Sequence, residues 1–327
     1  MKKIGTACLI LAYRRHENAL KILAKLSQSG IQEVYIAIDG PKSDFEYQKQ
    51  ENFVRDAIEY CKIHFVNLRI LRREENQGIA VAVISAIDWF FKNEIRGIIL
   101  EDDLEFATEF LEYSDDALNF FKDDYEVWTV SGNQFFETAT AINANSWCNY
   151  PLIWGWATWQ DRWIEIRKEI LSGSENILDF RLECRVANFW KAGLGRSRRG
   201  QIDSWAVPFA ARQRSLGKFT ILPKANLVKN NGIENDASHS KKTDWHINRE
   251  IRTVGANPQF SIVGRSEISM KNNKSIEKFV YNIEWFHCLS NLKFIFLGKL
   301  KKPIFDRSLK VRLENIQSVE TIYSFDK

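Results

Sequence analysis

The sequence has no long hydrophobic run. No stretch approaches the roughly 18 consecutive apolar residues that a membrane-spanning helix requires. The apolar run after Lys2 and Lys3 looks like the start of a signal peptide, but it ends at Tyr13-Arg14-Arg15 without a small-residue cleavage site. We therefore interpret this run as a first strand.

Cysteine is scarce and irregularly spaced. The five cysteines form no Cys-x-x-Cys pair, and no histidine stands at the distance typical of a zinc finger. This pattern argues against a structural zinc site and, with an odd count, favours buried thiols in a reducing compartment. The sequence thus predicts a cytoplasmic protein.

A strong excess of one charge is also missing. The formal net charge is +4 over 327 residues, too small to indicate nucleic-acid binding without a localised basic patch and an aromatic reading surface. Hydrophobic residues make up 45% and charged residues 27%, which is ordinary globular usage and argues against wholesale disorder. The length allows one large domain or two ordinary ones.

Short β-rich runs alternate with amphipathic helical patterns in residues 4 to 131. This alternation predicts an α/β fold in which a mostly parallel, twisted sheet carries helices on both faces. Apolar residues at helical spacing mark two of the helices, at 19–26 and 79–90. The expected strands are Ile4–Ala12, Val34–Ile38, Phe65–Leu71, Gly97–Leu100 and Val127–Val130.

The chain changes character twice after this first half, which we place at residues 1–135. Residues 136–265 are rich in Trp, Gly and Asn, and seven of the eleven tryptophans lie between Trp147 and Trp205, so we expect an acceptor-binding half lined by aromatic side chains. Residues 266–327 form a basic, partly aromatic C-terminal segment. Its mixture of bulky apolar groups and lysines favours either a helix on an anionic membrane surface or ordinary packing against the rest of the chain.

The apolar run at Gly97–Leu100 ends abruptly in three consecutive carboxylates, Glu101, Asp102 and Asp103. Adjacent acids repel one another, and a hard divalent cation with oxygen ligands would offset their charge. Two interpretations follow, a metal site for a phosphate-bearing substrate or a solvated acidic loop.

Other polar residues follow strands whose C-terminal ends share one edge, where ligands bind in open α/β sheets. Asp39 precedes Gly-Pro and either binds the base or ribose of a nucleotide or shapes a turn. Arg14 either contacts a base or phosphate or caps a helix start. Gly78 opens a helix whose N-terminus can host an oxygen-rich ligand, with Asn76 as a ligand contact or as a helix cap.

Together these motifs resemble those of the GT-A nucleotide-diphospho-sugar transferases. More narrowly, they look like those of bacterial relatives of the N-acetylglucosaminyltransferases that initiate complex N-glycan branching. The resemblance covers residues 4–240, and its specificity comes from the order and spacing of the motifs. They are Ala12-Tyr13-Arg14, Asp39, Asn76-Gln77-Gly78, Glu101-Asp102-Asp103, Gly155-Trp156-Ala157-Thr158-Trp159, Asp203-Ser204-Trp205, and Asn231-Gly232 to His239.

The resemblance implies a GT-A (Rossmann-like) fold and a site for Mn²⁺ or Mg²⁺. It implies Asp103 as a metal ligand, Asp102 near the ribose and pyrophosphate, and Glu101 near the sugar or a metal-bound water. His239 resembles the late histidine that completes the metal or pyrophosphate site in many of these enzymes, although a histidine in a polar loop is otherwise simply solvated. Ala12-Tyr13-Arg14 resembles the segment that passes along the nucleotide in this family.

An inverting transfer also needs a base that takes the proton from the acceptor hydroxyl, and the resemblance points to Asp203. In the family the corresponding segment reads Trp-Asp-Asp-Trp; here Ile202 replaces the first Trp and Ser204 replaces one acid. Asp161 is the second candidate, with a helix start beside Arg162 as its alternative role.

Two further segments have open interpretations. The tryptophans of residues 155–159 either shape a sugar pocket or, because Trp156, Trp159 and Trp163 have helical spacing, pack in the core. The glycine-rich basic stretch at residues 193–200 is either a loop that closes over the diphosphate or a solvated surface loop.

The sequence therefore predicts a metal-dependent glycosyltransferase. We expect it to move a sugar from a nucleotide-diphosphate donor, first a UDP-sugar, to a glycan or glycoconjugate acceptor with inversion. A sugar-phosphate nucleotidyltransferase is an alternative, but it needs a glycine-rich loop after the first strand and residues 12–16 contain no glycine. A non-catalytic nucleotide-sugar or glycan-binding module is the third possibility. We expect no nucleic-acid partner and a cytoplasmic location, with the C-terminal segment as a candidate for peripheral contact with the membrane.

Overall fold

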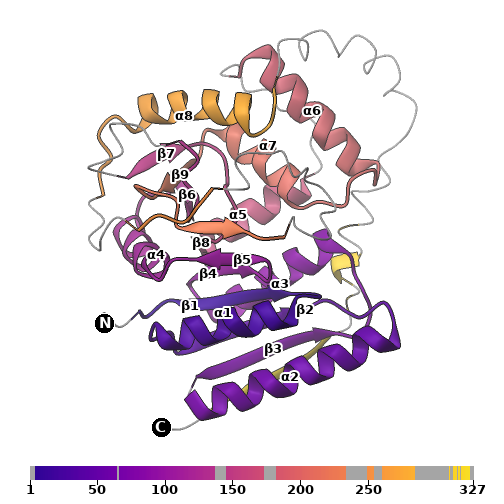
Figure 1. The fold of residues 1–327 in the computed structure, drawn as a ribbon. Helices are drawn as coiled ribbons and strands as arrows, with labels where there is room; N and C mark the ends of the chain where they lie inside the picture. Colours follow the sequence, from indigo (N-terminus) through magenta and orange to yellow (C-terminus); the bar gives the residue numbers. More distant parts are fainter. Residues whose placement is uncertain are drawn as a thin grey trace.

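A computed structural model describes residues 4–64, 66–136, 145–172, 182–232, 249–253, 260–283, 309, 312–314, 316 and 318–324. Its centre is a nine-stranded sheet with the order β11-β3-β2-β1-β4-β8-β6-β9-β7 (Figure 1). The strands are β1 (Ala7–Ala12), β2 (Glu33–Ile38), β3 (Asn67–Arg73), β4 (Arg96–Glu101), β6 (Val127–Ser131), β7 (Ser146–Cys148), β8 (Trp156–Trp159), β9 (Phe219–Leu222) and β11 (Ser318–Tyr323). A separate antiparallel pair consists of β5 (Leu104–Phe106) and β10 (Val228–Asn230).

Helices cover both faces of the sheet. They are α1 (His16–Gln28), α2 (Asp44–His64), α3 (Ile79–Asn93), α4 (Glu109–Phe120), α5 (Gln160–Leu171), α6 (Cys184–Arg198), α7 (Ala206–Leu216) and α8 (Arg265–Phe279). The predicted α/β class is confirmed, because β1 pairs in parallel with β2 and β4, β2 pairs in parallel with β3, and β6 pairs in parallel with β9.

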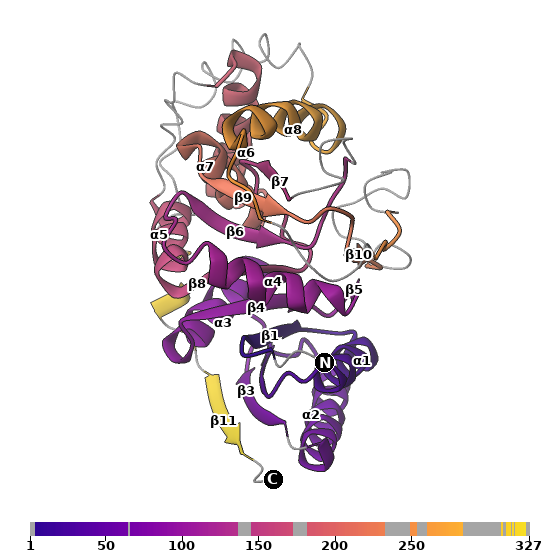
Figure 2. The same cartoon turned by 90° about the vertical axis from the view of Figure 1, so that its left-hand side faces the viewer.

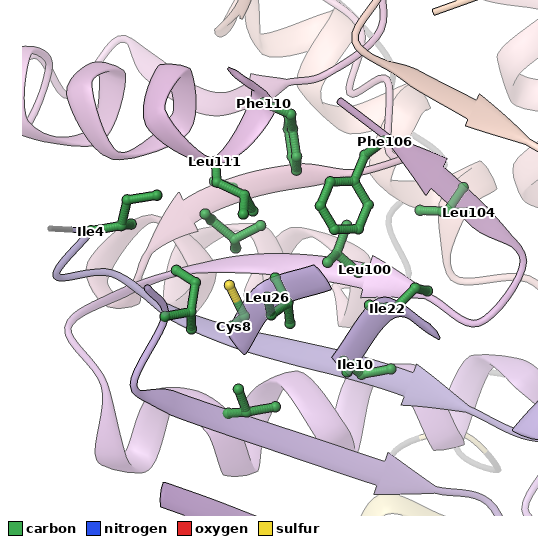
Figure 3. Packing of buried hydrophobic residues seen from close by; sticks show 14 of the residues in the cluster. Ile4, Cys8, Ile10, Ile22, Leu26, Leu100, Leu104, Phe106, Phe110 and Leu111 are labelled. Atoms are coloured by element: carbon green, nitrogen blue, oxygen red, sulfur yellow. The ribbon is translucent and has the colours of Figure 1, made fainter. Parts of the chain in front are cut away.

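One core lies between the sheet and helices α1, α2 and α4. Figure 3 shows part of it, where Ile22 and Leu26 of α1 and Leu111 of α4 point toward Cys8 and Leu100 of the strands. The helical stripe that the sequence predicts at residues 19–26 is confirmed, since Ala19, Ile22, Leu23 and Leu26 are all buried.

The second core lies on the opposite face, where alternate strand residues such as Leu9 and Ile99 pack against α3, α5 and α7. Helix α3 is buried nearly all round, which is more than its predicted stripe requires. Ile79 is the exception within that stripe: it is 45% exposed, because it stands in the first turn at the edge of the sheet.

Replacing Gly97 of β4 by Ala is expected to lower the free energy of unfolding by about 1–3 kcal/mol, the usual cost of overpacking a core. A methyl group there would lie 2.1 Å from Cε1 of the buried ring of Phe90. Gly5→Ala is the matched control, because an added methyl group at Gly5 meets nothing within 4 Å, and its effect should stay within about 0.5 kcal/mol. Urea unfolding of both variants measures the difference, and equal stabilities would contradict the packing of α3 on β4.

Strands from both predicted halves belong to one sheet. The predicted second half supplies β7, β8 and β9, while α6 and α7 form a further cluster with β7 and α8. The tryptophan prediction is partly wrong: Trp156 and Trp159 lie on a strand and not on a helix, whereas Trp163 lies on α5. All three are buried, so core packing is their observed role.

The predicted basic loop at residues 193–200 is also wrong, because residues 193–198 belong to α6. Glycines at helix positions 193 and 195 cost helix stability, yet they allow close packing. A methyl group on Gly193 would lie 3.3 Å from Cγ1 of Val207 on α7. The close approach of the two helices explains why a small residue stands at position 193.

The start of the C-terminal segment belongs to the fold. Helix α8 lies across β7, where Asn272 Nδ2 donates to the carbonyl of Trp147 at 2.8 Å and Asn273 Oδ1 accepts from the amide of Asn149 at 2.8 Å. The buried Glu277 accepts from Tyr150 Oη at 3.0 Å. Residues 284–308, on which the membrane hypothesis mainly depends, lie outside the described residues.

The end of the chain returns to the sheet as β11, which pairs antiparallel with the edge strand β3 from Ser318 opposite Arg73 to Tyr323 opposite Leu68. Figure 2 shows this strand beside β3, far from α8. The sequence analysis did not predict this strand. Among the helices described here, none is both long and apolar enough to cross a membrane.

Candidate functional site

The site is built at the C-terminal edge of the parallel strands. Ala12 of β1 lies opposite Ile38 of β2, Ile38 lies opposite Arg72 of β3, and Leu11 lies opposite Glu101 of β4. The residues that follow these four strands therefore meet at one edge, as the sequence predicts.

Asp102 ties the end of β4 to the loop after β1. Its backbone N–H donates to the carbonyl of Leu11 at 3.0 Å, and its Oδ2 accepts from the backbone N–H of Tyr13 at 2.8 Å and of Arg15 at 3.2 Å. Its carbonyl accepts from Asn18 Nδ2 at 2.6 Å. Asp102 thus fixes the course of the Tyr13–Arg15 loop, the segment that we expect to pass along the nucleotide.

Asp103 faces a different segment, which the β5–β10 pair brings beside it. The carbonyl of Asp103 accepts from the backbone N–H of Asn231 at 2.8 Å. A methyl group on Gly232 would lie 2.3 Å from Asp103 Oδ2, so only glycine fits there without displacement. Asp103 Oδ1 is buried and has no hydrogen-bond partner among the residues that the structure describes.

The three carboxylates destabilise one another's charge. Burial, together with the charges of Asp103 and Asp102, raises the pKa of Glu101 to about 8. Burial and the charge of Asp102 raise the pKa of Asp103 to about 6, although Arg15 opposes this shift. Such raised pKa values mean that added positive charge here would be stabilised.

The donor set fits a hard divalent cation. This donor set is small: among the described residues, no three or more His, Cys, Asp or Glu side chains are grouped so that they could hold a metal ion. Mg²⁺-like ions need only one or two carboxylates, because they keep waters and substrate phosphates as ligands. The unpartnered Oδ1 of Asp103 supplies one such oxygen. His239, the other predicted ligand, lies outside the described residues.

Asp39 organises the loop that precedes α3. Its Oδ1 accepts from the backbone N–H of Gln77 at 3.0 Å and of Gly40 at 3.0 Å, and its Oδ2 accepts from Asn76 Nδ2 at 2.9 Å. Burial raises the pKa of Asp39, and these amide donors oppose the rise. Asn76 is therefore tied to Asp39 and does not cap α3, and the two residues hold Gly78 in place.

A buried arginine that the sequence analysis missed lies near Asp39. Arg73, the last residue of β3, is 1% exposed, and its Nη2 donates to the carbonyl of Ala82 at 3.0 Å. Burial lowers the pKa of Arg73 to about 10, while the charge of Asp39 opposes the fall. Nothing in the sequence indicates that Arg73 is buried, because it ends a strand that also contains Arg69 and Arg72.

Asp203 reaches the same edge from the α6–α7 connection. A methyl group on Gly78 would lie 2.6 Å from Asp203 Oδ2 and 3.4 Å from Nη2 of Arg312, and Gly78 has a φ of 79° that only glycine adopts easily. The Asp203 carboxylate therefore stands at the N-terminus of α3, where the helix dipole favours negative charge. Its Oδ1 is buried and has no partner among the described residues.

Ser204, one of the two replacements beside Asp203, has a structural explanation. Ser204 Oγ accepts from the backbone N–H of Val207 at 3.3 Å, at the start of α7. Trp205 stacks on Trp156 with ring centroids 5.9 Å apart and planes inclined by 28°. Both rings are buried, so the residue two positions after Asp203 is packed into the core.

The alternative base Asp161 is excluded by its place in the fold. It stands in the first turn of α5 and accepts from Arg162 Nη1 at 2.9 Å and 2.8 Å. Trp159, two residues earlier, lies opposite Arg96, which begins β4. Asp161 therefore lies at the edge of the sheet opposite to Asp103, in the helix-start role that the sequence offered as its alternative.

The two arginines after β1 point to different partners. Arg14, which the sequence predicts to contact the nucleotide, forms an ion pair with Glu46 at 2.6 Å and has a 53% exposed side chain. Arg15 instead lies against Asp102 and Asp103. Sequence reasoning missed Arg15, because adjacent arginines are indistinguishable until the backbone direction is known.

Comparisons with known proteins give no further constraint: no protein-family model matches the sequence, and a search of curated proteins finds no match. The class that the fold and the site define is thus an α/β protein with an acidic centre at the C-terminal edge of its parallel strands.

Proposed function

We propose that this protein is a metal-dependent glycosyltransferase of GT-A architecture. It transfers a sugar from a nucleotide-diphosphate donor, first a UDP-sugar, to a glycan or glycoconjugate acceptor with inversion. The single observation that carries the proposal is the unpartnered, buried Oδ1 of Asp103 at the C-terminal edge of β4. The α/β fold with its mostly parallel sheet is compatible with this architecture.

In this proposal, different residues at the C-terminal edge of the sheet hold the metal ion and the nucleoside. Asp103, with His239 as the second proposed ligand, would hold Mn²⁺ or Mg²⁺, and the cation would stabilise negative charge on a departing diphosphate. The Tyr13 loop, fixed by Asp102, and the Asp39–Asn76 network would hold the nucleoside.

Asp203 acts on the acceptor in this proposal. Its unpartnered Oδ1 takes the proton from the acceptor hydroxyl as that oxygen attacks the anomeric carbon, while the N-terminus of α3 stabilises the carboxylate before the transfer. The packing of Trp205 on Trp156 anchors the segment that carries Asp203.

The proposal is tested with a panel of nucleotide sugars, each incubated with Mn²⁺ or Mg²⁺ and no acceptor. Slow release of the nucleoside diphosphate from one donor, lost on chelation, is the expected result. Absence of turnover, together with no thermal shift by any nucleotide, would overturn the proposal. Nucleotide binding without turnover would favour a non-catalytic module instead.

Mn²⁺ binding is expected to weaken as the pH falls through about 6, by up to about tenfold per pH unit below it, because a proton and the metal compete for Asp103. The sign follows from the raised pKa of this carboxyl, which takes up its proton at a higher pH than an ordinary Asp. Isothermal titration of Mn²⁺ across this range measures the effect. A constant affinity from pH 7 to pH 5 would contradict the assignment of Asp103 as a ligand.

A further inference from the structure

We propose that Arg15 is a counter-ion of the acidic centre formed by Glu101, Asp102 and Asp103. In this proposal the divalent cation displaces the Arg15 guanidinium, and the guanidinium then binds the donor diphosphate. This inference rests on the proposed function and adds a residue and an order of binding to it. Three contacts carry it. Arg15 Nη1 lies 3.4 Å from Asp103 Oδ2 and 3.7 Å from Asp102 Oδ1, and its Nη2 donates to the carbonyl of Gly232 at 2.9 Å.

The acidic motif itself sets the position of this guanidinium. The backbone N–H of Arg15 donates to Asp102 Oδ2 at 3.2 Å. Asp102 therefore fixes the backbone of Arg15, and the guanidinium of Arg15 in turn offsets the charge of Asp102. The charge of Arg15 lowers the pKa values of Glu101 and Asp103 against the rise that burial causes. Without a metal, the guanidinium supplies the positive charge that the three acids require.

The pairing is weak enough to be exchanged. Both N–O distances exceed that of a good charge-assisted hydrogen bond, and the Arg15 side chain is 39% exposed, so solvent screens the attraction. Arg15 contacts Oδ2 of Asp103, and Oδ1 has no partner among the described residues, so Oδ1 is available as a metal ligand. A divalent cation bound at Asp103 would repel the guanidinium and free its donors.

The freed guanidinium suits a diphosphate. Its planar fork of N–H donors matches phosphate oxygens in bidentate geometry. The exchange keeps charge balanced, because the cation replaces the guanidinium at the carboxylates while the guanidinium moves to the two new phosphate charges. When the metal binds alone, Arg15 loses its attraction to the carboxylates and gains no new partner. When the diphosphate binds as well, Arg15 pairs with the phosphate oxygens.

Arg55 of α2 provides a matched control outside the site. It has the same side chain, which is 69% exposed and contacts its helix neighbours Asn52 and Asp56. Removing its charge should therefore change neither metal nor diphosphate binding through the acidic centre.

The test measures binding and needs no turnover. Titrations of Mn²⁺ alone, and of uridine diphosphate at saturating Mn²⁺, are compared for the wild type, Arg15→Gln, Arg15→Lys and Arg55→Gln, at a pH where Asp103 is ionised. We expect Arg15→Gln to bind Mn²⁺ alone about tenfold more tightly and uridine diphosphate about tenfold more weakly, effects of the size that one nearby charge exerts. Arg15→Lys, which keeps the charge but loses the fork, should retain the wild-type Mn²⁺ affinity and bind the diphosphate weakly.

The proposed exchange predicts that Arg15→Gln changes the two affinities in opposite directions, with tighter Mn²⁺ binding and weaker uridine diphosphate binding. If Arg15→Gln weakens both titrations, Arg15 only supports the local structure and the inference is wrong. If Mn²⁺ affinity is unchanged, Arg15 does not compete with the metal and the inference is equally wrong, although the proposed function stands. If neither the wild type nor Arg15→Gln binds Mn²⁺ or uridine diphosphate, the proposed function itself fails.

Discussion

Asp103→Asn is expected to lower turnover of the nucleotide-sugar donor by about a thousandfold or more, the scale of losing a main source of transition-state charge stabilisation. The change removes the negative charge of a carboxylate whose Oδ1 is buried and has no partner among the described residues. The side chain keeps its size, and the contacts of the Asp103 backbone with Asn231 do not depend on the charge. Steady-state release of the nucleoside diphosphate at saturating Mn²⁺ measures the loss.

A matched control separates loss of chemistry from loss of fold. Asp56→Asn alters an exposed carboxylate of α2 that pairs with its neighbour Arg55, and it should leave turnover unchanged. Unfolding of the Asp103 variant should occur at or above the wild-type temperature, because one member of a repelling acidic cluster becomes neutral. Turnover that survives in a folded Asp103→Asn protein would refute the metal-site proposal.

Asp203→Asn is expected to lower sugar transfer to the acceptor by about 10²- to 10⁴-fold, the range of general base catalysis. Donor affinity should change little, because the acidic centre that we propose to hold the diphosphate is intact. The separation of the two effects is the informative result, and it is measured as kcat against the KM for the donor.

Asp161→Asn is the control for this prediction, because Asp161 lies at the opposite edge of the sheet and pairs with Arg162. It should leave kcat unchanged. A comparable loss in both variants would mean that each acts through stability and that Asp203 is not the base.

The sequence predicted much of the parallel half of the fold. Apolar runs marked β1, β2, β3, β4 and β6, because strands buried on both faces need continuous hydrophobic residues. The boundaries shifted by a few residues; β1 begins at Ala7 and not at Ile4, and β4 extends through Glu101. Such shifts follow from pairing, since a strand ends where its neighbours stop offering hydrogen bonds.

Elements that depend on distant partners were harder to predict. The glycine-rich stretch at 193–198 looked like a loop, but packing of α6 on α7 outweighs the low helix propensity of glycine. The short strand at Ser318–Tyr323 forms because β3 offers a free edge, and nothing in its exposed sequence requires it.

The candidate site divides in the same way. Residues on the ends of parallel strands could be brought together from the sequence alone, since the C-terminal ends of such strands share an edge, and this argument placed Tyr13, Asp39, Asn76 and Asp103. The assignment between Arg14 and Arg15 could not be made, because it depends on the direction of a loop that Asp102 fixes through two hydrogen bonds.

By itself the sequence determined the α/β class and the acidic end of β4, because hydrophobic periodicity and a run of adjacent charges are local properties of the chain. Only the tertiary structure decided which arginine neutralises that charge, which aspartate reaches the N-terminus of α3, and which carboxylate oxygens have no partner in the described part of the chain. These are contacts between residues far apart in the chain, so they exist only once the sheet has been assembled and its helices packed upon it.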